Sequence, residues 1–253
     1  MPQQQAVAPA FPQVRVVPAA APFRWLRLAF DDLRACPGPS VFYGLCFAAM
    51  GALLKVVFAH AYQYLSALTC GFLLLGPFLA IGIYEIARRR EHGEACRPAP
   101  TLAVWRRNAA SIGVFSLILT VVFLVWARAS LVIFALFYTS EMPTLAGFMQ
   151  QVLSVNNLEF LAVYFAVGLG FAALVFAVSV VSIPLMMDRG QDTVTAMIAS
   201  FLALARNPGA MLVWAALIVL LTALGLLTLF IGLILAMPLV GLATWHAYRD
   251  LVA

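Results

Sequence analysis

The sequence has little charge, and this scarcity excludes the usual soluble globular classes. Only 10% of the 253 residues are Asp, Glu, Lys or Arg, whereas 64% are hydrophobic and the mean hydropathy is +1.01. Soluble domains carry about 25% charged residues, so a fold in water could not hide this much apolar surface. In lipid the unit of organisation is a span of about 20 residues. We therefore expect a polytopic membrane protein.

Histidine is also scarce, and this excludes haem chemistry in the membrane. The chain has three histidines, His60, His92 and His246. A catalytic subunit of a haem-copper oxidase needs several intramembrane histidines for two haems and a copper. His60 lies at the end of the first apolar run, His246 at the end of the last run, and His92 in a loop between runs. No two of them can therefore bracket a haem. We expect no cofactor.

The four cysteines, Cys36, Cys46, Cys70 and Cys96, show no CxxC spacing. Cys46 and Cys70 fall inside apolar runs, where cysteine behaves as a small hydrophobe. We expect neither a disulfide nor a zinc site, nor any other metal site.

Catalytic and nucleic-acid signatures are missing as well. The sequence has no GxxxxGK[ST] phosphate loop, no HExxH, no GxSxG and no pair of carboxylates on one face of an apolar helix. The net charge of +5 arises from short basic clusters between apolar runs and not from an extended basic face, so nucleic acid is not an expected partner. We expect no catalytic residue and no enzymatic activity.

What the sequence has is a series of apolar runs. They are apolar on every side, unlike the alternating strands of a membrane barrel, so helix is the expected state. The expected fold is an all-α transmembrane helical bundle of about six spans, forming a single domain over residues 23–253. Residues 1–22, rich in Pro, Ala and Gln, are expected to be a disordered cytoplasmic tail. The spans are expected at residues 40–61, 64–87, 110–138, 158–187, 209–226 and 228–248.

Arginines mark one side of the membrane. They precede the first span, separate spans 2 and 3 and spans 4 and 5, and follow span 6, whereas the opposite loops contain Glu141 and Glu159 and no basic residue. Basic loops face the cytoplasm, so we expect a multi-pass protein of the bacterial inner membrane with both termini cytoplasmic. The arginines are 24, 27, 34, 88, 89, 90, 97, 106, 107, 189, 206 and 249.

Two segments ahead of spans are amphipathic, at residues 23–35 and 192–206. Each could lie on the cytoplasmic leaflet with its arginines at anionic headgroups, or pack against the bundle.

Similar basic and aromatic residues precede spans 1, 3 and 5, and prolines at 77, 184 and 238 interrupt spans 2, 4 and 6. Three repeated helical hairpins would explain this pattern, as would a common composition of inner membrane interfaces.

Three charged residues near or inside the spans are candidates for function. Lys55 and Arg128 are expected to snorkel, to pair with Glu141 or Glu159, or to line a substrate or ion path. Glu85 stands three residues before Arg88, where an ion pair within the helix is the simplest interpretation and a proton relay the alternative.

The pattern resembles a family of predicted bacterial integral membrane proteins without an established function, some labelled as a cytochrome c oxidase subunit. The resemblance rests on Trp25-Leu26-Arg27, on Asp31-Asp32-Leu33, on residues 76–85 (GPFLAIGIYE) and on the six-span layout. It implies a helical membrane fold and no catalytic residue. Because the histidines exclude a catalytic subunit, only an accessory role in such a complex would agree with it.

Two functional hypotheses remain. The leading one is a non-enzymatic scaffold or accessory factor, for another membrane protein complex or for lipid organisation. The alternative is a small-molecule or ion transporter or channel, favoured by Lys55, Arg128 and the interrupted spans. A polar cavity containing either residue would favour transport, and a dry interior would count against it.

Overall fold

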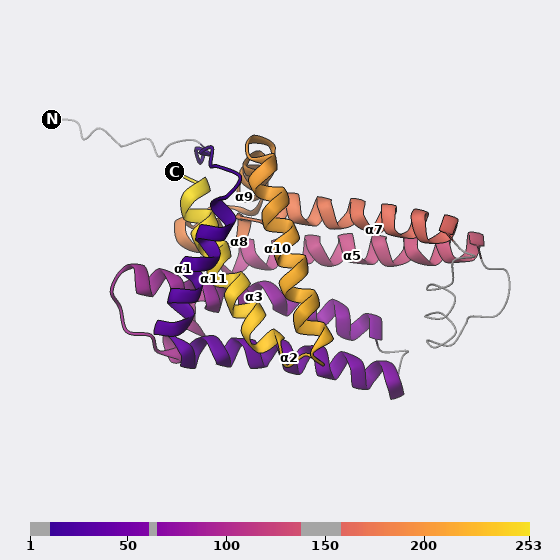
Figure 1. Cartoon of the computed structure of the whole chain (residues 1–253), viewed down its shortest axis with the longest axis horizontal. Helices are drawn as coiled ribbons and strands as arrows, with labels where there is room; N and C mark the ends of the chain where they lie inside the picture. Colours follow the sequence, from indigo (N-terminus) through magenta and orange to yellow (C-terminus); the bar gives the residue numbers. More distant parts are fainter. Residues whose placement is uncertain (1–10, 61–64, 138–157) are drawn as a thin grey trace.

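The computed structural model describes residues 11–60, 65–137 and 158–253, and these residues are almost entirely helical (Figure 1). The expected all-α bundle is confirmed. Its helices are α1 (Ala21–Ala35), α2 (Pro37–His60), α3 (Leu65–Glu91), α4 (Pro98–Thr101), the 3-10 helix η2 (Val104–Asn108), α5 (Ala109–Phe137), α7 (Leu158–Ser179), α8 (Ser182–Arg189), α9 (Thr193–Arg206), α10 (Pro208–Leu227) and α11 (Leu233–Leu251).

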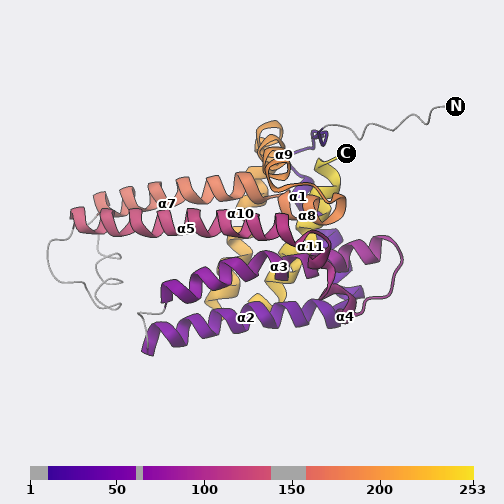
Figure 2. The ribbon, with the colours of Figure 1, turned by 180° about the vertical axis from the view of Figure 1, so that it is seen from behind.

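Four of these helices run side by side and two cross them. Figures 1 and 2 show α2, α3, α5 and α7 extending in one direction, with α10 and α11 crossing them steeply. Helix α1 lies along α11 at the end where the described chain begins and ends. Helix α11 also packs against α2, α3 and α10, which makes it the centre of the fold.

The helices occupy all six ranges in which spans are expected. Four described segments are long and apolar enough to cross a membrane, namely Pro37–Val57, Ala109–Phe137, Leu158–Arg189 and Pro208–Leu227. Helices α3 and α11 each end in a polar segment, Arg88–Glu91 and Trp245–Asp250 respectively. The bundle is therefore established, while the number of spans remains a prediction.

The last two helices form a tight hairpin. Leu229 and Phe230 have positive φ angles of 55° and 70° in its turn, and the Thr228 hydroxyl accepts a hydrogen bond from Gly232 N at 2.8 Å. The hairpin packs closely on α2 because glycines there leave room. A Cβ built on Gly44 would lie 2.0 Å from the Ile234 carbonyl oxygen.

Both amphipathic segments form the expected helices and pack on the bundle. In α1, Trp25 and Ala29 are fully buried, and Trp25 meets Trp214 of α10 edge to face, with ring centroids 5.9 Å apart. In α9 the buried face is made of small residues, such as Ala196, Ala199 and Ala203. Val194, Ile198 and Phe201 lie on the exposed face, whereas Met197, Leu202 and Leu204 are partly buried against the core.

The start of the described chain is ordered, which corrects the expected disordered tail for residues 11–22. The backbone N–H of Arg15 donates to Leu251 O at 2.8 Å, and Ala253 N donates to Gln13 O at 2.8 Å. The Asn207 side chain accepts from Val17 N and donates to Arg15 O. Composition could not show this order, because the partners come from the opposite end of the chain.

A second correction concerns the cysteines. Cys36 and Cys96 form a disulfide, with Cα atoms 5.6 Å apart and a sequence separation of 60. The expectation of no disulfide was wrong because it relied on local spacing. The pairing depends instead on the folding of the segment after α3 back onto the corner between α1 and α2.

Candidate functional site

The structure separates the three charged candidates. The Glu85 side chain, on α3, is completely buried, whereas Lys55 on α2 and Arg128 on α5 are exposed. Glu159, one expected partner, is also exposed and forms no ion pair with either residue in the described part of the chain, and Glu141 lies outside it. Lys55 and Arg128 are thus on the outer surface of the described bundle.

Glu85 is held by the arginines that follow it in the last turns of α3. Arg88 donates to both carboxylate oxygens, at 2.6 and 2.8 Å, and Arg89 Nε donates at 3.0 Å. The expected ion pair within the helix is confirmed, since spacings of three and four residues share a helix face. The hydrogen bond with Glu85 raises the pKa of the Arg88 guanidinium above its ordinary value.

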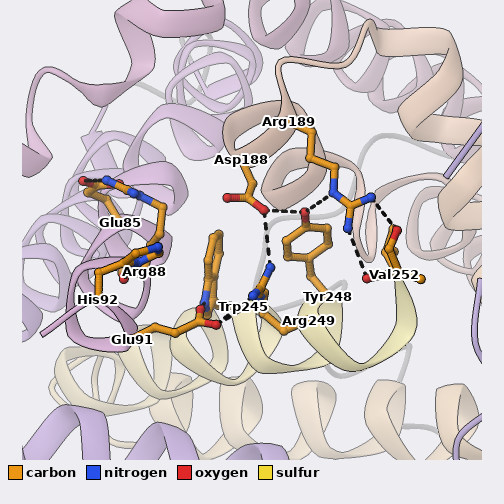
Figure 3. A network of polar contacts seen from close by, with 11 residues as sticks. Glu85, Arg88, Glu91, His92, Asp188, Arg189, Trp245, Tyr248, Arg249 and Val252 are labelled. Atoms are coloured by element: carbon orange, nitrogen blue, oxygen red, sulfur yellow. Dashed lines mark hydrogen bonds and ion pairs between the residues drawn. The ribbon is translucent and has the colours of Figure 1, made fainter. Parts of the chain in front are cut away.

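A second group of polar side chains joins α3, α8 and α11 beside this pair (Figure 3). Glu91 accepts hydrogen bonds from the Trp245 indole at 3.2 Å and from Arg249 at 2.8 and 3.1 Å. The Tyr248 hydroxyl donates to Asp188 at 2.6 Å, and Arg249 lies 3.7 Å from the same carboxylate. Three helices distant in sequence are linked through two carboxylates.

Arg189 connects this group of polar side chains to the C-terminal residues. Its Nε donates to the Tyr248 hydroxyl at 3.1 Å, and its terminal nitrogens donate to the carbonyls of Val252 and Ala253 (Figure 3). The last residues of the chain are therefore fixed to the end of α8.

A third group joins α1 to α3 and α11. The nearly buried Asp32 lies 2.9 Å from Arg90 Nη1 and 2.7 Å from His246 Nε2. Asp250 accepts from the Trp25 indole and pairs with Arg24. Together these three groups make up what we call the polar end of the molecule. Its ionisable members are Arg24, Asp32, Glu85, Arg88, Arg89, Arg90, Glu91, Asp188, Arg189, His246, Arg249 and Asp250.

Sequence reasoning identified Glu85 but missed most of this network. The sequence indicated no partner for Asp188, Asp32 or His246. The available signal was the clustering of carboxylates and arginines at the ends of several apolar runs. That clustering indicates a common membrane depth but not which residues pair. Asp192 lies outside this network: it caps α9, and hydrogen bonds from Thr195 hold its pKa below the ordinary value.

The side chains of the polar end mainly join helices to one another through ion pairs and hydrogen bonds. Each carboxylate named in it accepts from, or lies beside, at least one basic side chain. In the part of the chain that the structure describes, no three His, Cys, Asp or Glu side chains gather in a way that could hold a metal ion. The arrangement resembles a structural ion-pair network more closely than an acid-base site.

An apolar groove lies outside the polar end, and none of the charged residues named above lines it. It has a volume of about 320 Å³ and lies between α5 and α7, lined by residues that include Phe123, Trp126, Gly168 and Phe171. A second hollow, of about 340 Å³, lies beside residues 11–14 and is bordered by Leu202 and Arg206 of α9. Neither contains Lys55, Arg128 or Glu85.

Comparison with curated proteins and with solved structures finds no match for this chain. A family model does match. It covers the region from the start of α3 to the end of α8, which includes Glu85 with its two arginines and Asp188. Residues 65–188 match the family described as predicted integral membrane protein (DUF2189), so the resemblance to an uncharacterised family of membrane proteins is confirmed.

Proposed function

We propose that this integral membrane protein is a non-enzymatic scaffold or accessory factor of a membrane complex. The observation that carries the proposal is the position of the charges. The candidate residues for a path, Lys55 and Arg128, are exposed on the outside of the bundle. The buried carboxylate Glu85 is already held by Arg88 and Arg89.

The depth of Lys55 and Arg128 favours snorkelling over transport. Lys55 lies 18 residues after the start of α2 and Arg128 lies 19 residues after the start of α5, about 27 and 28 Å along their helices. A hydrocarbon core is about 30 Å thick, so helices that start at one interface bring both cations near the other. Long cationic side chains reach headgroups from such positions.

We infer that the polar end faces the cytoplasm, and that the membrane is the bacterial inner membrane. The supporting facts are the arginines of the polar end and the absence of basic residues between spans on the other side in the sequence. The first described residues and the C-terminal residues are bonded to one another at this end. Both termini therefore share a side in this proposal.

We further infer that α9 rests in the cytoplasmic leaflet. Its outward side chains Val194, Ile198 and Phe201 are 63%, 45% and 55% exposed, and Arg206 ends the helix. An apolar face beside arginine suits the boundary between acyl chains and anionic headgroups.

A bimane probe on Phe201→Cys, in a background without other cysteines, should be quenched by spin-labelled lipid. The same probe on Glu94→Cys should not be. Equal quenching at both positions would reject this placement.

The scaffold proposal is tested by purification in a gentle detergent, followed by mass spectrometry of the proteins recovered. The affinity tag belongs at the N-terminus, because Val252 and Ala253 accept hydrogen bonds from Arg189. Stoichiometric recovery of a second membrane complex, absent when an unrelated multi-pass protein is the bait, is the expected result.

Proteoliposomes containing the purified chain test the alternative. Dyes that report proton, sodium and potassium movement should show no flux above empty liposomes. Flux through the unmodified chain that disappears in Lys55→Gln or Arg128→Gln would overturn the scaffold proposal in favour of transport. Because neither exposed side chain contributes to the described core, unfolding of the variant would not explain such a loss.

A further inference from the structure

The Cys36–Cys96 bond joins two segments that are otherwise separate in the chain. Cys36 is the single residue between α1 and α2, and Cys96 lies in the irregular segment between α3 and α4. Their Cα separation of 5.6 Å falls in the usual range for bonded cysteines. The bond therefore fixes the segment 92–97 to the corner where the chain enters α2.

The two sulfurs differ in access. Cys36 is 1% exposed, and its carbonyl accepts a hydrogen bond from the Ser40 hydroxyl at 2.8 Å. Cys96 is only half-buried, and its neighbours Ala95 and Arg97 are exposed. An external thiol would therefore reach Cys96 first.

Arg34 and Arg97 flank the two cysteines in sequence, so the bond lies on the arginine-rich side of the protein. Cytosolic thiol systems keep most cysteines reduced, and disulfides that do form there are usually transient or redox-sensing. We propose that Cys36 and Cys96 are a reversible dithiol–disulfide switch, an inference that rests on the cytoplasmic orientation proposed above.

The switch needs only thiol–disulfide exchange with a dithiol protein or with glutathione. In reduction by a dithiol donor, a donor thiolate attacks Cys96 Sγ, the S–S bond breaks, and Cys36 leaves as a thiolate that takes a proton from water. The second donor thiol then attacks the mixed disulfide and releases Cys96, so the donor ends as a disulfide. Oxidation is the reverse exchange with a donor disulfide.

Breaking the bond should leave the bundle intact. The segment after Cys96 keeps a second tether, the Tyr43 and Thr101 hydroxyls 2.8 Å apart, and the segment before it keeps the Arg89–Glu94 ion pair at 3.2 Å. The residues released would be those between these tethers, on the surface beside the polar end.

The experiment follows the thiols of the full chain in native membranes. Cys46→Ser and Cys70→Ser remove the other thiols, and acid-quenched cells are treated with a polyethylene glycol maleimide that shifts the band once for each free thiol. Untreated cells should give two additions, cells treated with diamide none, and diamide followed by dithiothreitol two again. Cys96→Ser is the matched control and should give one addition throughout.

Two results would overturn the switch. A band without additions in untreated cells, unchanged by a permeant reductant, would make the bond a permanent structural link. Two additions that persist after diamide would mean that the bond does not form in the membrane.

Orientation is tested separately with Glu94→Cys in a chain lacking the four native cysteines. An impermeant maleimide should label it only after the cells are permeabilised. Labelling of intact spheroplasts would reject the orientation itself. With the orientation upheld, either overturning result above rejects the switch alone.

Discussion

The polar end and the α5–α7 hairpin are built on opposite principles. At the polar end, Glu85 and Trp25 are completely buried, and carboxylates from α1, α3, α8 and α11 are paired across helices. In α5 and α7, only 11% and 6% of the residues in the most apolar stretches are buried by the rest of the described chain. One region is held by specific contacts within the protein, and the other offers an apolar surface to its surroundings.

This difference shows where the specificity of the fold resides. An apolar hairpin in lipid gains nothing from the hydrophobic effect by packing on its neighbours, because acyl chains are as apolar as leucine. Ion pairs, hydrogen bonds and close backbone approach distinguish one helix arrangement from another. We therefore expect substitutions at the polar end and at the α2–α11 contact to affect stability more strongly than matched substitutions in α5 and α7.

The largest effect is expected from Glu85→Ala. It leaves two partly buried guanidiniums without their carboxylate, and removal of one member of a buried pair costs about 3 kcal/mol. The measurement is the apparent free energy of unfolding in mixed detergent micelles titrated with dodecyl sulfate. Glu159→Ala, an exposed carboxylate on α7, is the control and should change little. Equal losses in both variants would show that the two regions do not differ.

A smaller loss, about 2 kcal/mol, is expected from Gly44→Ala. The new Cβ would meet the backbone of Ile234, which cannot rotate away, so α2 and α11 must separate. Gly113→Ala in α5 is the matched control, because a Cβ there meets nothing within 4 Å and alanine favours helix. The same titration distinguishes them, and a stable Gly44→Ala variant would argue against the close approach of α11.

Tyr248→Phe should cost about 1 kcal/mol. It removes a hydroxyl that donates to Asp188 at 2.6 Å and accepts from Arg189 at 3.1 Å, which leaves both groups short of a partner. Tyr164→Phe on α7 is its counterpart in the hairpin, where the structure shows ring contacts with Phe160 and Phe165. Thermal unfolding in detergent should separate the two variants, and coincident melting curves would contradict the expectation.

The smallest effect, below about 0.5 kcal/mol, is expected from Leu169→Ala. This side chain on α7 is 71% exposed, so its removal leaves no cavity in the protein. A loss above about 1 kcal/mol in the same detergent titration would show that a partner or a second copy covers this face in the micelle.

The sequence allowed the helices to be located but not their partners. The apolar runs predicted α2, α3, α5, α7, α10 and α11 because helix is the state that satisfies the backbone in lipid. The Glu85–Arg88 pair was also predictable, because it lies within one helix. The bonds of Asp32 to Arg90 and His246 were not, since the three residues come from α1, α3 and α11.

Two errors have the same origin. Residues 11–20 look disordered by composition, yet Asn207 and the C-terminal residues bind them. Cys36 and Cys96 show no local motif, yet the fold brings them together. In both cases the deciding partner is more than 50 residues away, beyond the reach of any periodicity or spacing argument.

The sequence by itself determined that the chain is helical, that it belongs in a membrane and that most of its arginines cluster between the apolar runs. These properties follow from composition and from charge that varies along the chain. Only the tertiary structure decided that α11 is the centre, that α9 turns its small residues inward, and that Lys55 and Arg128 lie outside the bundle. These properties depend on which helix faces contact each other, and in a uniformly apolar helix no face is marked in the sequence.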